Sequence, residues 1–146
     1  MPTEKWSSGT SRGTLLTTEL NALANGSYSA VGTELDNATN LDRFAIAILD
    51  CDWVSATTLD AVVNLYAVCA PDGTNYEDGS ASLRYPYDSF CGVFQVYNTT
   101  AAQKLITRPF ELRPFKTKFA VYNGSGQNMP ASGTTVTVYT FNRVVS

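Results

Sequence analysis

Apolar and polar residues alternate with a period of two in several stretches of the chain, most clearly between positions 115 and 122. One side of this stretch carries Phe115, Thr117, Phe119 and Val121, and the other carries Lys116, Lys118, Ala120 and Tyr122. Because successive side chains of a β-strand leave opposite faces of the pleat, this pattern predicts a half-buried strand. Residues 123–126, Asn-Gly-Ser-Gly, are typical of a turn and end the strand.

A second stretch, 134–141, is rich in β-branched and aromatic residues, which suit a pleated surface. Its apolar phase shifts from Val136 and Val138 to Tyr139 and Phe141. A shift of this kind indicates either a β-bulge or a strand that is buried on both faces.

The stretch 43–49 is apolar on both of its sides. Its larger residues, Phe44, Ile46 and Ile48, fall on one face, and two alanines, at 45 and 47, fall on the other. This arrangement predicts a core strand whose second face packs closely against another element. A further core strand is predicted at 62–69.

The remaining elements are predicted from weaker patterns. Short strands are expected at 27–35, at 94–97 and at 103–112, the last of them broken by Pro109 because proline has no N–H for the ladder. Leucines at helical spacing between 15 and 26, with Thr17 as a candidate N-cap, predict a turn or two of helix.

About six or seven short strands, separated by Gly, Asn and Asp loops and not alternating with helices, favour an all-β fold. We therefore predict an antiparallel β-sandwich or jelly roll, with at most one short helix, in a single domain at 15–146. Residues 1–14 are polar and lack periodicity, so they are predicted to form a short, flexible N-terminal arm.

Composition narrows the chemistry that the chain can perform. Histidine is absent, which removes the Ser-His and Cys-His nucleophile pairs and the commonest transition-metal ligand. The loop 72–79 departs from a calcium-binding loop, because no Glu follows at its distal position. The other acids sit beside turn residues, where carboxylates are common for backbone reasons. We expect no enzymatic activity, no cofactor and no metal.

The same features bear on location and partners. The chain has no apolar run near the ~20 residues of a membrane span, and its first residues lack the apolar core of a secretion signal. We therefore expect a protein that is made in the cytosol and does not bind a membrane. Lys116, Lys118 and Tyr122 share one face, but a pI near 4.8 argues against nucleic-acid binding.

The net charge of −3 is unevenly distributed along the chain. Residues 1–88 hold twelve of the thirteen acids and four bases, whereas residues 89–146 hold six bases and Glu111 alone. Two interpretations stay open: the fold mixes both halves evenly, or a basic edge faces an acidic partner. The candidate residues of such an edge are Lys104, Arg108, Arg113, Lys116 and Lys118.

Aromatic residues outside the strands are the other candidates for an interface. Trp6 lies in the polar arm together with Arg12, so it either folds back onto the domain or anchors on a neighbouring subunit. Tyr85 and Tyr87 lie on a loop, where they suit a binding surface or the closure of one end of a sandwich. A carbohydrate-binding sandwich is a competing hypothesis, with Trp53 and Tyr76 as further candidate residues.

Three stretches are informative through their residue composition and their order along the chain: Leu15–Gly26, the loop Pro71–Tyr76 and the segment Phe119–Gln127. Together they resemble small virion proteins encoded among the structural genes of tailed bacteriophages, over about residues 14 to 143. The resemblance implies a jelly-roll capsid decoration (cement) protein that stabilises the shell, bound to its outside as a dimer or trimer. The implied partners are copies of itself and the major capsid protein or another virion protein, and the implied location is the virion, assembled in the host cytoplasm. A tail or head–tail component is the second possibility.

Overall fold

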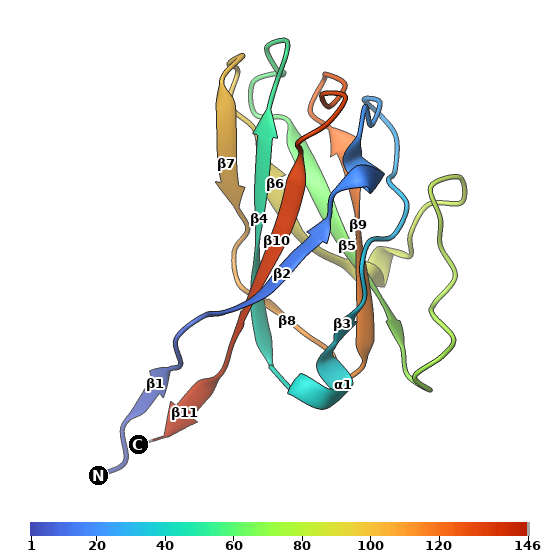
Figure 1. Ribbon diagram of the computed structural model, residues 1–146. Helices are drawn as coiled ribbons and strands as arrows, with labels where there is room; N and C mark the ends of the chain where they lie inside the picture. The colour runs from blue at the N-terminus through green and yellow to red at the C-terminus, as the bar shows by residue number, and fades with distance from the viewer. Residues whose placement is uncertain (146) are drawn as a thin grey trace.

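The alternating stretches form two antiparallel sheets that pack face to face, in a computed structural model that describes residues 1–145 (Figure 1). One sheet has the order β2 (Thr10–Leu16), β10 (Thr135–Phe141), β4 (Phe44–Asp52) and β7 (Ala102–Ile106), with β8 (Phe110–Glu111) also beside β4. The other has the order β3 (Leu35–Asp36), β9 (Lys116–Gly124), β5 (Val62–Ala70) and β6 (Phe90–Gln95). The prediction of an all-β sandwich is confirmed.

The order of the eight main strands follows from one long hairpin. Pairing runs inward from the ends of the chain, as β2 with β10, β3 with β9, β4 with β7, and β5 with β6. Folding this hairpin over itself then brings β10 beside β4 and β9 beside β5. These eight strands in two sheets have jelly-roll connectivity, in which the first and last sandwich strands are neighbours.

A two-stranded ribbon extends from one end of the sandwich and carries both termini (Figure 1). It pairs β1 (Glu4–Trp6) with β11 (Arg143–Val145). Strand β2 begins at Thr10, so the boundary expected between residues 14 and 15 falls inside a strand. The polar sequence of residues 1–14 gave no sign of this pairing, because the partner strands lie at the opposite end of the chain.

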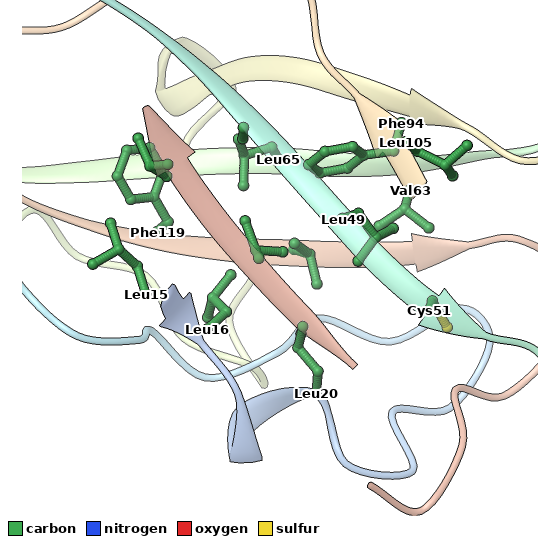
Figure 2. Packing of buried hydrophobic residues seen from close by; sticks show 14 of the residues in the cluster. Leu15, Leu16, Leu20, Leu49, Cys51, Val63, Leu65, Phe94, Leu105 and Phe119 are labelled. Atoms are coloured by element: carbon green, nitrogen blue, oxygen red, sulfur yellow. The ribbon is translucent and has the colours of Figure 1, made fainter. Parts of the chain in front are cut away.

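The core fills the space between the two sheets. Figure 2 shows side chains from both sheets, among them Leu49, Leu65, Phe94 and Phe119, directed into this layer. The inward positions of β4 are its alanines, Leu49 and Cys51, whereas Phe44, Ile46 and Ile48 point outward. Small residues fit there because the opposite sheet supplies the large rings.

Two details of the strands agree with their sequence patterns. Strand β10 pairs with β4 in unbroken register and alternates regularly between buried and half-buried side chains, so the apolar residues at 139 and 141 reflect a strand covered on both faces and not a bulge in β10. The register shifts between β10 and β2 come from extra residues in β2. The segment 103–112 is interrupted at Pro109, which separates β7 from β8.

The helical elements lie elsewhere than expected. The only α-helix among the described residues is α1 (Asn37–Asn40). Its sequence is rich in Asn and Thr, which are more typical of turns. In the segment 15–26, where a helix was predicted, Leu15 and Leu16 belong to β2, and the helical part is a single 3₁₀ turn at Thr18–Leu20. Thr17 makes no side-chain capping bond, so its predicted role is wrong. Another 3₁₀ turn spans Tyr87–Ser89.

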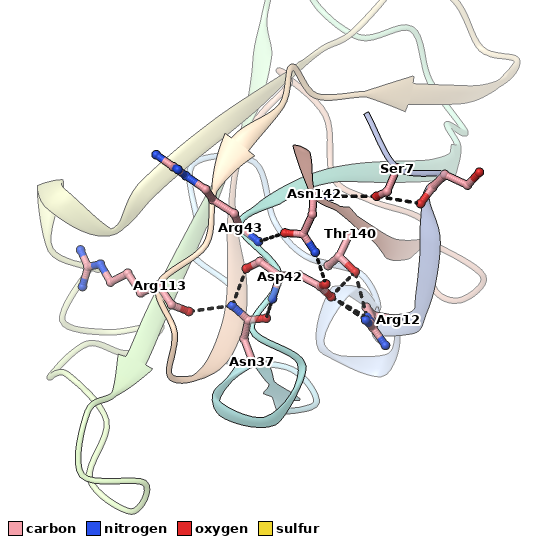
Figure 3. Close-up of polar contacts among 9 residues, drawn as sticks. Ser7, Arg12, Asn37, Asp42, Arg43, Arg113, Thr140 and Asn142 are labelled. Carbon is pink, nitrogen blue, oxygen red and sulfur yellow. Dashed lines mark hydrogen bonds and ion pairs between the residues drawn. The ribbon is translucent and has the colours of Figure 1, made fainter. Parts of the chain in front are cut away.

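Asp42 is the centre of a polar network that joins the two ends of the chain (Figure 3). Its carboxylate accepts hydrogen bonds from Arg12 Nη2 at 2.5 Å, Thr140 Oγ1 at 2.6 Å and Asn142 Nδ2 at 2.9 Å. The buried Asn37 amide donates to the main-chain oxygens of Asp42 and Arg113, both at 2.8 Å. Asn142 also exchanges backbone and side-chain bonds with Ser7.

The environment of Asp42 favours its charged form. Burial by itself would raise the pKa of Asp42, but the hydrogen bonds from Thr140 and Arg12, the charge of Arg12 and the bond from Asn142 together lower it. A lowered pKa in the folded state stabilises the protein above the unfolded-state pKa of about 3.9, and this contribution disappears as the pH falls through the folded-state value.

We therefore predict that Asp42→Asn lowers the free energy of unfolding at pH 7 by about 2–3 kcal/mol, because hydrogen bonds to a charged group are lost. The deficit relative to the natural protein should shrink as the pH falls below about 4, because Asp42 is protonated first in the unfolded chain and then, at its lowered pKa, in the folded protein. Urea denaturation between pH 7 and pH 2.5 measures both effects.

Asp50→Asn is the matched control, because Asp50 lies on β4, close in sequence to Asp42, but makes only an exposed 3.6 Å pair with Lys104. Asp50→Asn should change the free energy of unfolding by no more than about 0.5 kcal/mol. An Asp42→Asn deficit of equal size at pH 7 and pH 2.5 would contradict the proposed role of the charge.

Candidate interaction surface

The outward face of the sheet β2-β10-β4-β7 is unusually apolar. The register places Phe44 beside Phe141, Ile46 beside Tyr139, and Ile48 beside both Thr137 and Ile106. We call the following residues the apolar outer face: Trp6, Phe44, Ile46, Ile48, Ile106, Tyr139 and Phe141. A sheet with one face on the core normally carries polar residues on the other, so this face is a candidate for contact with a partner.

Trp6 extends the apolar outer face beyond the sheet. Its ring packs edge-on against Phe44 at 5.4 Å and Phe141 at 5.5 Å between centroids, and Arg143 lies over it. Trp6 therefore folds back onto its own domain, which was one of its two expected fates. The side chain is nevertheless 60% exposed. A hollow bounded by Trp6, Phe44, Phe110 and Phe141 opens beside it, with a volume of about 380 Å³.

Most charged groups around the apolar outer face are paired within the chain. Lys104 pairs with Asp50, Arg43 pairs with Glu111 at 3.5 Å, and Arg143 pairs with Glu4. All three pairs are exposed at the surface, so each contributes little to stability. Their effect is to reduce the net charge at the margin of this face, where Arg108 beside Ile106 is the exception.

The candidate basic edge is largely paired within the chain. Lys104 contacts Asp50, Arg113 lies 2.9 Å from Glu77, and Lys116 lies 3.7 Å from Glu34. Lys118 lies 4.5 Å from the centre of the Tyr76 ring. Arg108 makes no ion pair within residues 1–145 and borders a hollow beside Ile106. These five residues do not gather into one patch, because they lie on strands of both sheets and on the linkers between them.

The side chains of two candidate interface residues are engaged in contacts within the chain. Arg12 is bound to Asp42, and the Tyr85 hydroxyl donates to the Ser29 carbonyl at 2.7 Å while its ring is 6% exposed. Both are therefore removed from the candidate interface. A truncation of residues 1–13 would remove Arg12 and part of β2 together with the arm. Tyr87, in contrast, is 86% exposed.

The aromatic residues suggested for a glycan groove do not all line one groove, because Tyr85 and Tyr87 border a common hollow and the other two do not. Trp53 is fully buried in the main core, and its Nε1–H has no partner within the described chain. Tyr76 packs against Lys118 and donates to Glu34. The sequence suggested these residues because they lie in polar loops. Whether such a loop residue is buried depends on how the two sheets pack, which the loop sequence does not specify.

Metal ligands and reactive thiols are the remaining chemical groups to consider among residues 1–145. No three Cys, Asp or Glu side chains there are grouped so that they could hold a metal ion. Burial raises the pKa of Cys51 to about 11 and also raises that of Cys91, so these thiols stay protonated and unreactive at neutral pH. No helix in the described chain is long and apolar enough to cross a membrane.

Comparison of the chain with protein-family models, with curated proteins and with solved structures finds no match. The arguments on function therefore depend on the surfaces described above.

Most of the apolar outer face was missed by sequence reasoning. Its signal was present, because residues 43–49 are apolar on both sides and the phase of 134–141 shifts outward at Tyr139 and Phe141. Neither pattern identifies the outward face without the position of the second sheet.

The two tryptophans give a direct test of this placement. With Trp6 exposed and Trp53 buried, acrylamide should quench only part of the natural protein's fluorescence. In Trp6→Phe, the remaining emission from Trp53 should be blue-shifted and resist quenching, because the quencher cannot reach a buried ring.

Trp53→Phe is the matched variant, since it removes an unpartnered buried N–H and leaves Trp6 as the single, quenchable fluorophore. Equal quenching in the two variants would contradict the exposure of Trp6 and the burial of Trp53.

Proposed function

We propose that this chain is a structural protein of a tailed-bacteriophage particle, of the capsid decoration (cement) type, which attaches through the apolar outer face. The observation that supports the proposal is this face itself: six large apolar side chains on the outer side of one sheet, extended by Trp6 of the terminal ribbon, with most charges at the margin paired. The resemblance of the chain to small phage virion proteins supplies the type of particle.

The size of the face suits attachment in many copies. Three strands ~4.8 Å apart and about five residues along each, together with the Trp6 ring, outline roughly 300 Å². The largest apolar patch of a typical monomer covers about 300–600 Å² and is often functional, whereas each side of a standard stable interface buries ~800 Å². A single contact through this face is therefore expected to be weak. On a symmetric shell, contacts repeated among neighbouring copies convert weak affinity into lasting attachment.

The chemistry of the face suits an adhesive role. Aromatic rings supply large, rigid contact area with few rotatable bonds, so little side-chain entropy is lost on binding. The paired charges at the margin neither repel a second copy nor require an oppositely charged partner. Such a face fits contacts with copies of the chain and with an apolar strip of a shell subunit, here the major capsid protein.

The test of the particle assignment is the protein's abundance in purified particles. Quantitative mass spectrometry of density-gradient-purified phage, produced from the genome that encodes the chain, should find it in numbers comparable to the shell subunit. A few copies per particle would favour the tail or head–tail alternative, and absence from particles would exclude both.

The test of the attachment face uses single substitutions. We expect Ile106→Glu and Trp6→Ala to lower occupancy on particles that lack the natural protein by at least about tenfold, because a charge or a lost ring disrupts the apolar contact. Co-sedimentation of purified variants with such particles measures occupancy.

Leu59→Glu is the control for Ile106→Glu, since Leu59 is also exposed but lies in the loop between β4 and β5, outside the face. If it reduces occupancy as strongly as Ile106→Glu, the attachment face has been placed wrongly.

A further inference from the structure

The outward face of the second sheet carries a cluster of tyrosines, separate from the apolar outer face. Tyr66 on β5 and Tyr122 on β9 are covered by Tyr28 and by Tyr85 from the segment 71–89. The centroid of the Tyr28 ring lies 4.7 Å from that of Tyr122 and 5.8 Å from those of Tyr66 and Tyr85. We call these four residues the tyrosine cluster.

A hollow of about 330 Å³ opens between the tyrosine cluster and the segment 78–87. Three tyrosines of its lining, Tyr28, Tyr66 and Tyr87, offer apolar rings. Arg84 and Asp78 lie at its margin, and the Arg84 guanidinium faces the Tyr28 and Tyr87 hydroxyls. The volume lies at the lower end of the ~300–1,000 Å³ typical of small-ligand sites.

The walls of the hollow are held in place before any ligand arrives. The Tyr85 hydroxyl is fixed on the Ser29 carbonyl. Gly79 packs against Tyr85 so closely that an added Cβ would lie 2.7 Å from the ring. Arg84 has a φ of 69°, which is uncommon for a residue with a side chain. A preformed site of this kind loses little entropy on binding.

We propose that this hollow binds a neutral pyranose sugar, with the ring C–H groups on the tyrosine faces and the hydroxyls on Arg84 and Asp78. A pyranose has apolar faces and a rim of hydroxyls that both donate and accept, which matches aromatic walls next to one donor group and one acceptor group. The Tyr66 hydroxyl is protonated at neutral pH, as is usual for tyrosine, and can serve as a further donor.

Other small ligands match the hollow less well. An anion would meet Arg84 but be repelled by the Asp78 carboxylate. A proline-rich peptide offers carbonyl acceptors without N–H donors, so Asp78 would lack a partner. A flat base prefers parallel walls, whereas Tyr28 is tilted by 55° to Tyr66 and by 60° to Tyr85.

A neighbouring hollow of about 320 Å³ shares Gly79 and Tyr85 with the first and is bordered by Ser80 and Ser82. The hydroxyls of these serines suit a second sugar residue. A disaccharide is therefore expected to bind more tightly than the corresponding monosaccharide.

Saturation-transfer NMR on the full chain is the test, with methyl glycosides of glucose, galactose and N-acetylglucosamine as probes. At least one should receive transfer at its ring C–H protons, with a dissociation constant of roughly 1 mM, as expected for a ligand of this size. Inorganic phosphate and a decaproline peptide are probed in parallel.

Two variants locate the binding site without threatening the fold. Tyr87→Ala removes an exposed ring, and Arg84→Gly removes the guanidinium while glycine accepts the positive φ. Each should weaken glycoside binding about tenfold, the order expected for one lost stacking or hydrogen-bond partner. Tyr97→Ala, which removes another exposed tyrosine outside the hollow, should leave binding unchanged.

Three results would overturn the proposal. These are no transfer to any of the glycosides, glycoside binding that survives in both Tyr87→Ala and Arg84→Gly, and binding of phosphate or decaproline in place of the glycosides. The proposal is independent of particle attachment, because the hollow and the apolar outer face lie on different sheets.

Discussion

The arrangement of this protein depends on one buried carboxylate, Asp42. A charge in this position is stable only while Arg12, Thr140 and Asn142 direct their donors at it, which ties the first strand of the sandwich to the last. The link determines where the terminal ribbon leaves the sandwich, and therefore places Trp6 against Phe44 and Phe141. Because Asn37 bonds both the Asp42 and Arg113 carbonyls, the same network also joins the two sheets at this end.

The two sheets expose different chemistry on their outward faces. The sheet that contains β4 and β10 has an apolar outward face with most of its marginal charges paired, and this face suits contact with other protein surfaces. The sheet that contains β5 and β9 is covered by a loop segment and by tyrosines that surround a small, partly polar hollow. A jelly roll permits this division because its two sheets share one core and are free to differ on their outer sides. Attachment and ligand recognition can therefore be assigned to opposite sides of one small domain.

The charged residues of this protein act mainly through short-range ion pairs within the chain. The strong separation of acids and bases along the sequence disappears in the fold, because the nested hairpin pairs early strands with late ones. Lys104 thus meets Asp50, and Lys116 meets Glu34. Asp42 is the exception among the acids, since its charge is held in the interior of the fold, where the loss of a partner has a large cost.

The sequence by itself determined the strand pattern, because alternation with a period of two is a local property of the chain. It predicted the sandwich, the interruption at Pro109 and the apolar character of both faces of 134–141. Only the tertiary structure decided which side of an apolar strand faces inward: Phe44, Ile46 and Ile48 point outward because the rings of the opposite sheet already fill the core beside the small alanines. It likewise decided that Trp53 is buried, that Arg12 binds Asp42, and that Tyr28, Tyr66 and Tyr87 meet around one hollow. Such contacts join residues far apart in the chain, and no local pattern encodes them.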